Sequence, residues 1–150
     1  MLEPVGVSER DSRRFDGVTV AAYESGRPLA CDATIIHTCA PSHLKIAVSA
    51  AGAAAAAAES HKRMHYSDLN GRFDFRAVGL ETLGAFGPQA IELVESLVSR
   101  VRSQTGDLCA RSRITRRLAA AIQAGNARTI IAAHASMKNG RFAGAYQPRA

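Results

Sequence analysis

A nearly unbroken run of alanine at residues 50–58 is the feature that most restricts what this chain can fold into. Alanine is the best helix former, while Pro41-Ser42 and Asn70-Gly71 supply the signals of a helix start and a helix end. The sequence therefore predicts one long helix over about residues 42–70. Its small side chains would let it lie close against a sheet, with Glu59, Lys62 and Arg63 facing outward or toward a cleft.

The alanine run is too short and too weakly hydrophobic to span a bilayer, and no stretch of eighteen apolar residues occurs elsewhere. The first ten residues lack the basic region and apolar core of a secretory signal, and three cysteines are too few for a disulfide framework. We therefore expect an intracellular protein, nuclear or cytoplasmic, that is not secreted and has no membrane partner.

Strand-like segments lie on both sides of the alanine-rich helix. The β-branched and aromatic runs at residues 18–23 and 29–36 are separated by turn residues and predict a β-hairpin, and the alternation at residues 73–80 predicts a third strand. Helical spacing of apolar residues then predicts a helix over about 88–104 that ends near Gly106.

A further helix is predicted from the spacing of Ile114, Leu118 and Ile122, ending at Gly125-Asn126, with a short fourth segment at about residues 127–137. The predicted fold is a small α/β or α+β domain, a small mixed sheet with the long helix packed on it and additional C-terminal helices. We expect a flexible segment at residues 1–14, one domain at 15–137 and a disordered tail at 138–150.

Positive charge is concentrated in the C-terminal third of the chain. Residues 1–96 carry nine Lys and Arg against twelve Asp and Glu, whereas residues 97–150 carry ten against one. Such a segment favours nucleic acid as the partner, with an anionic membrane surface or simple solubility as the alternatives. The candidate phosphate contacts are Arg111, Arg113, Arg116 and Arg117, which could equally form an ordinary solvated helix face.

Two aspartates are candidates for a metal site. Asp16 precedes the first predicted strand and Asp32 lies in the second, so a hairpin could bring both carboxylates to one edge of the sheet, where hard oxygen ligands bind Mg²⁺. Lys62 could lean over such a site and stabilise developing phosphate charge. The alternatives are a turn or solvated aspartate and a solvated helix lysine, although Asp32 in an apolar strand needs a partner.

Two common enzyme classes lack their motifs. The chain has no Gly-x-Ser-x-Gly nucleophile elbow and no Gly-x-x-x-x-Gly-Lys phosphate loop. Serine hydrolases of the nucleophile-elbow type and phosphate-loop kinases are therefore disfavoured.

Six segments follow one another in a distinctive order: RRFDG (13–17), LACDAT (29–34), TCAPSHL (38–44), AAESHKRMHY (57–66), VGLETLGAFGP (78–88) and AIQAGNA (121–127). This series, spanning about residues 13–130, resembles the C-terminal region of non-LTR-like retroelement reverse-transcriptase polyproteins. That region is in turn similar to restriction-like endonucleases of the PD-(D/E)XK type.

The resemblance implies a partial restriction-endonuclease-like core without its first helix and strand. It also implies metal-dependent hydrolysis of DNA with Mg²⁺ as the cofactor. Asp16 and Asp32 would be the metal-binding acids, and Lys62 would be the catalytic lysine, relocated from a strand to the helix, with Tyr66 supporting the site.

Three positions depart from the family pattern: Phe15 stands where the family has proline, Cys31 where it has tryptophan, and His65 where it has a second lysine. The first two would change how the aspartates are presented, and the third removes a cation near the scissile phosphate. Two further hypotheses therefore stay open. One is a non-catalytic nucleic-acid-binding remnant of a reverse-transcriptase polyprotein, and the other is a reading frame without a selected function.

Overall fold

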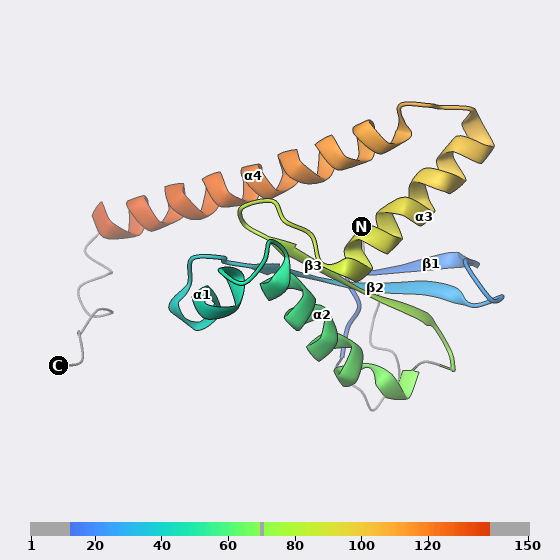
Figure 1. Ribbon diagram of the computed structural model, residues 1–150, viewed down its shortest axis with the longest axis horizontal. Coiled ribbons are helices and arrows are strands. Elements are labelled where there is room, and N and C mark those ends of the chain that lie inside the picture. Colours follow the sequence, from blue (N-terminus) through green and yellow to red (C-terminus); the bar gives the residue numbers. More distant parts are fainter. Residues whose placement is uncertain (1–12, 70, 139–150) are drawn as a thin grey trace.

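The structure, a computed structural model, describes residues 13–69 and 71–138, so most of the segments predicted to be flexible at 1–14 and disordered at 138–150 lie outside it. It is a small α+β fold with a mixed sheet, as predicted (Figure 1). Its elements are β1 (Gly17–Ala22), β2 (Pro28–Ile36), α1 (Pro41–Ala47), α2 (Ala53–His65), the short 3₁₀ helix η1 (Ser67–Leu69), β3 (Asp74–Glu81), α3 (Pro88–Thr105) and α4 (Ala110–Lys138).

The three strands form one sheet in the order β1-β2-β3. β1 and β2 form the predicted antiparallel hairpin, with Gly17 opposite Cys31, and its turn uses the left-handed residues Ser25 and Gly26. β3 runs parallel to β2, so that Asp32 is paired with Ala77. The hairpin and the third strand are therefore confirmed close to their predicted bounds.

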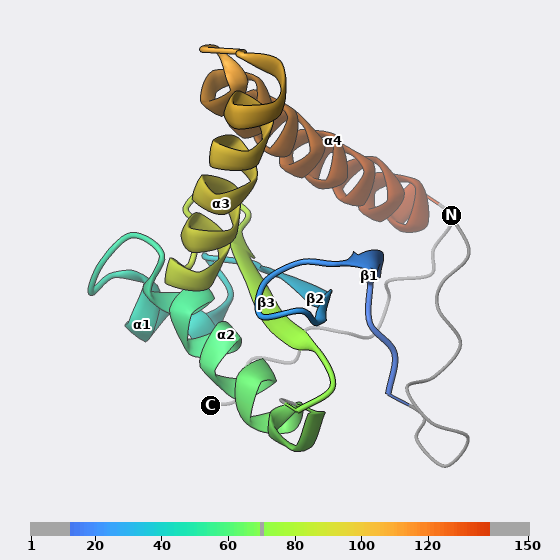
Figure 2. The same cartoon turned by 90° about the vertical axis from the view of Figure 1, so that its right-hand side faces the viewer.

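Helices cover both faces of the sheet (Figures 1 and 2). On one face α2 lies so close that a Cβ on Gly79 would stand 2.6 Å from the carbonyl oxygen of Ala55. On the other face Leu80 packs with Ala90 of α3 and Ile122 of α4. Because successive strand residues point to opposite faces, the sheet lies between α2 and α4. None of the helices in the described residues is long and apolar enough to cross a membrane.

The predicted single helix over residues 42–70 is wrong, because the structure divides it into α1 and α2. The chain turns at Gly52, which takes a left-handed conformation with φ of 83° and begins α2. The new helix start is stabilised from a distant part of the chain, since the Glu81 side chain accepts hydrogen bonds from the amides of Ala54 and Ala55. This tertiary contact outweighs the helix propensity of the alanine run.

Gly52 should therefore tolerate substitution poorly. A Cβ there would lie 2.6 Å from the carbonyl oxygen of Phe86, and its positive φ is strained for alanine. We expect Gly52→Ala to lower the free energy of unfolding by about 2 kcal/mol. Gly125→Ala is the matched control, because it lies within α4 with open space around it and should raise stability by up to about 1 kcal/mol. Urea denaturation of both variants checks this, and equal effects would contradict it.

The predicted helix end at Gly125-Asn126 is also wrong, since α4 runs without interruption from Ala110 to Lys138. Gly125 is not among the glycines with a positive φ. The side chain of Asn126 does not cap the helix but donates a hydrogen bond of 2.8 Å to the carbonyl oxygen of Thr82. The predicted packing stripe is confirmed, because Ile122 is buried and Ile114 and Leu118 pack against the core of α3.

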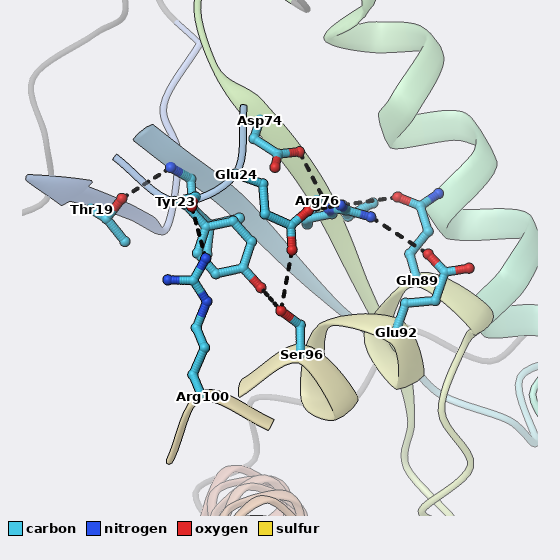
Figure 3. A network of polar contacts seen from close by, with 11 residues as sticks. Thr19, Tyr23, Glu24, Asp74, Arg76, Gln89, Glu92, Ser96 and Arg100 are labelled. Atoms are coloured by element: carbon cyan, nitrogen blue, oxygen red, sulfur yellow. Dashed lines mark hydrogen bonds and ion pairs between the residues drawn. The ribbon is translucent and has the colours of Figure 1, made fainter. Parts of the chain in front are cut away.

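A polar network fastens the hairpin turn to α3 (Figure 3). Arg76 of β3 pairs with Glu24 at 3.0 Å and approaches Glu92 at 3.5 Å. Arg100 donates a 2.7 Å hydrogen bond to the carbonyl oxygen of Tyr23 and lies over its ring, 4.1 Å from the centroid. The end of the hairpin away from Asp16 is therefore held on the α3 side of the sheet.

Candidate functional site

Asp32 and Lys62 form an ion pair at the face of the sheet covered by α2. The Lys62 Nζ atom lies 2.8 Å from Asp32 Oδ2. The Asp32 side chain is only 8% exposed, whereas that of Lys62 is 32% exposed. A buried carboxylate requires a charged or hydrogen-bonding partner, and this lysine supplies one. The sequence prediction that the two residues belong to one site is consistent with this contact.

Asp16 joins this pair through the register of the hairpin. Gly17 is opposite Cys31, so the next residue pair outward along the two strands places Asp16 beside Asp32. Asp16 is exposed, and its Oδ2 accepts a 2.7 Å hydrogen bond from the amide of Ala33. The three predicted residues, from the segment before β1, from β2 and from α2, therefore lie in one region of the structure.

Tyr66 lies at the end of α2, one turn after Lys62, and contacts the segment that precedes Asp16. Its hydroxyl group donates a 3.0 Å hydrogen bond to the carbonyl oxygen of Arg14. Burial, together with the nearby carboxylate of Asp32, raises the pKa of Tyr66 to about 12. The phenol is therefore protonated at neutral pH and ties the segment before Asp16 to α2.

The same segment is held by a second contact at Arg13. Its guanidinium group forms hydrogen bonds of 2.7 and 2.6 Å with the two carboxylate oxygens of Asp68, and a further 2.7 Å bond to the carbonyl oxygen of His65. The hydrogen bonds from Arg13 lower the pKa of the exposed Asp68 carboxyl group. Arg13 and Tyr66 thus fix the backbone from which Asp16 projects.

The three positions at which the sequence differs from the retroelement pattern that it resembles occupy distinct environments. Phe15 is buried in an aromatic cluster, with ring centroids 5.1 Å from Tyr66 and 5.8 Å from Phe75. Cys31 follows the alternation to the face opposite Asp32, and burial, with the nearby aspartates, raises the pKa of its thiol. His65 is exposed and lies edge-on against Tyr66. Phe15 therefore helps to anchor the segment before β1 that carries Asp16.

Glu59 is buried, although the sequence predicts that it faces outward or toward a cleft. It is 1% exposed and faces β3 and the start of α3. Its carboxyl oxygens accept hydrogen bonds from the amides of Gly79, Gln89 and Ala90 at 3.0, 2.9 and 2.9 Å. The last two belong to the first turn of α3, whose amides have no partner within the helix. Glu59 thus caps α3 and fixes the rotation of α2, one turn from Lys62.

The four candidate arginines lie on α4, on the far side of the sheet from Asp32 and Lys62 (Figure 1). Arg111 is paired with Glu95 of α3, and Arg113 is paired with Asp107. Arg113, Arg116 and Arg117 line a surface hollow of about 420 Å³ together with Cys109 and Ala120. The structure therefore brings the predicted catalytic residues together and places the predicted phosphate contacts elsewhere.

The donor chemistry of the aspartate pair fits a hard divalent cation. Among residues 13–69 and 71–138, no three His, Cys, Asp or Glu side chains gather into a ready ligand set. Mg²⁺, however, binds proteins through one or two carboxylates and keeps several of its waters. Asp16 and Asp32 could supply those carboxylates, and the semi-exposed Lys62 would stand next to them.

Comparisons of the chain with protein families, with curated proteins and with solved structures find no match. The interpretation of the site therefore depends on its own residues and contacts and on the sequence pattern described above.

Proposed function

We propose that this chain is a retrotransposon-derived, restriction-like endonuclease domain that hydrolyses phosphodiester bonds in DNA with Mg²⁺. The observation that carries the proposal is the ion pair of Lys62 with the buried Asp32, formed where the hairpin register brings Asp16 alongside. An aspartate pair with a neighbouring lysine is suited to phosphodiester hydrolysis, which requires a bound cation and stabilisation of negative charge. The resemblance of residues 13–130 to retroelement polyproteins supports the same activity.

In this proposal the residues divide the work. Asp16 and Asp32 would hold the Mg²⁺ ion, and the ion would supply Lewis-acid activation of the phosphate and of water. Lys62 Nζ neutralises charge that develops on the phosphate oxygens. Tyr66 and Arg13 act on geometry, because they hold the segment that carries Asp16. A nuclear or other DNA-containing compartment inside the cell is part of the proposal.

The test is nicking of supercoiled plasmid with Mg²⁺ or Mn²⁺. We expect nicking that EDTA abolishes, and Asp32→Asn should reduce its rate by at least about 100-fold. Asp74→Asn is the matched control, since Asp74 pairs with Arg76 at the start of β3 and should leave nicking intact. Absence of nicking in a sample shown by circular dichroism to be folded would refute the enzyme.

The second candidate is a non-catalytic nucleic-acid-binding remnant. It is favoured by α4, which carries six Lys and Arg residues and no Asp or Glu. A polyanion could bind this helix whether or not the aspartate pair binds a metal. Salt-dependent DNA binding without metal-dependent nicking would select this candidate.

A further inference from the structure

Because α4 is one continuous helix, most of its basic side chains lie on one face of it. At 3.6 residues per turn, its cations other than Arg111 point within an arc of about 120° around the helix axis. They are Arg113, Arg116, Arg117, Arg128 and Lys138, and all five are exposed. We call these five residues the α4 stripe. With a rise of 1.5 Å per residue, the stripe is about 38 Å long.

The stripe faces away from the rest of the protein. The packing residues Ile114, Leu118 and Ile122 are centred about 140° around the axis from the middle of the stripe. Arg111 lies on their side of the helix, where it pairs with Glu95 of α3. Within the described residues, Arg117, Arg128 and Lys138 have no carboxylate within ion-pair distance. The outer face of α4 therefore carries five exposed cations, of which Arg113 is paired with Asp107, and the exposed Ile131 lies between Arg128 and Lys138.

The chemistry of the helix narrows the class of partner. α4 contains no Asp or Glu, so nothing on it repels phosphate. It also contains no Phe, Tyr or Trp, and single-stranded nucleic acid is usually held by stacking of its bases on aromatic rings. A membrane-surface helix would need a free apolar face along its length, but the apolar stripe in the first half of α4 is packed on α3 and the sheet. In the second half, Ile130, Ile131 and Met137 are exposed, so vesicle binding is included among the outcomes of the test below. The length of about 38 Å is close to one turn of B-form DNA.

We propose that the α4 stripe binds the phosphate backbone of duplex DNA, at a surface separate from the Asp16 and Asp32 site. α2 and α4 lie on opposite faces of the sheet (Figures 1 and 2), so the stripe holds a stretch of duplex other than the one at the aspartates. The proposal does not depend on cleavage. Because its contacts are to phosphates, binding is independent of base sequence.

The test measures binding of a fluorescein-labelled 24-base-pair duplex by fluorescence anisotropy in EDTA, between about 50 and 200 mM NaCl. Each phosphate contact contributes about 0.9 to the slope of log K against log salt. The triple variant Arg117→Gln, Arg128→Gln, Lys138→Gln should therefore flatten this slope by about 2 to 3 units. Arg128→Gln alone should flatten it by about 1, which tests the part of the stripe beyond Gly125.

Arg111→Gln is the comparison that tests orientation, because it removes the same charge from the packed side of the same helix and should leave the slope as in the wild type. An unchanged slope in the triple variant would overturn the proposal. So would tighter binding of a single-stranded oligonucleotide, or binding of phosphatidylserine vesicles in place of the duplex. Because EDTA prevents cleavage, DNA binding and nicking are measured independently. A protein that binds duplex DNA through the stripe but does not nick plasmid would refute only the proposed function. A protein that nicks plasmid, but whose triple variant keeps the wild-type salt slope, would refute only the stripe.

Discussion

Glu59→Ala is expected to lower the free energy of unfolding by about 3 to 5 kcal/mol. The substitution removes the acceptor of the buried amides of Gly79 and Ala90 and of the half-buried amide of Gln89. Each such unsatisfied donor costs about 1 to 3 kcal/mol, and water entering the space left by the side chain recovers part of that loss. Since a domain of this size is stabilised by only about 5 to 15 kcal/mol, the variant would lose a large part of its stability.

The measurement is urea denaturation followed by circular dichroism. Glu92→Ala is the matched control, because it is the same substitution at a helix position 65% exposed and should change stability by less than about 0.5 kcal/mol. Glu59→Gln preserves the shape and one acceptor oxygen, so it should fall between the two. Equal stability of Glu59→Ala and Glu92→Ala would show that the buried hydrogen bonds do not hold α3 in place.

Lys62→Met is expected to separate metal binding from catalysis. Removing an ammonium group 2.8 Å from Asp32 Oδ2 takes away a cation that competes with a divalent ion for the same carboxylate. Mn²⁺ should therefore bind several-fold more tightly, while the single-turnover rate of plasmid nicking falls by about 100- to 1000-fold as the phosphate loses its neutralising charge. Methionine keeps the unbranched stem of the side chain, so the volume that the side chain fills changes little.

Mn²⁺ binding is measured by titration calorimetry and nicking under single-turnover conditions. Arg63→Met removes one positive charge from the neighbouring, exposed position and should alter both quantities by less than about two-fold. A Lys62→Met protein that cleaves at the wild-type rate would exclude Lys62 from catalysis. One that binds Mn²⁺ more weakly than the wild type would show that the lysine does not compete with the metal.

The fold could be predicted wherever the local sequence pattern agrees with the tertiary contacts. Alternation and turn residues identified the hairpin and β3, and helical spacing identified α3 with its end at Gly106. The two errors have one cause. Where a helix ends depends on contacts with residues distant in the sequence. Glu81 binds the start of α2, and the carbonyl oxygen of Thr82 binds Asn126 within α4. The helix propensity of Gly52 or Gly125 carries no information about these contacts.

The candidate site could be predicted because Asp32 is a charged residue within an apolar strand. Asp32 was selected because a carboxylate within an apolar strand needs a partner, and its ion pair with Lys62 supplies one. The same reasoning applies to Glu59 at the end of the alanine run, where every residue from 53 to 58 is alanine. Its partners are backbone amides rather than side chains, so no second residue type in the sequence marked them.

The two buried glutamates also connect the secondary structure elements into a series. Glu81 at the end of β3 caps α2, and Glu59 on α2 caps α3 while accepting the amide of Gly79 from β3. Breaking the hydrogen bonds at the start of α2 or of α3 exposes a carboxyl group from a neighbouring element of the fold. The amides of Ala54, Gly79 and Ala90 should therefore exchange their hydrogens with solvent in one shared opening event, whereas the solvent-surrounded end of α4 exchanges independently. The sheet and the helices that flank it thus form one cooperative unit, and the distal half of α4 is outside it.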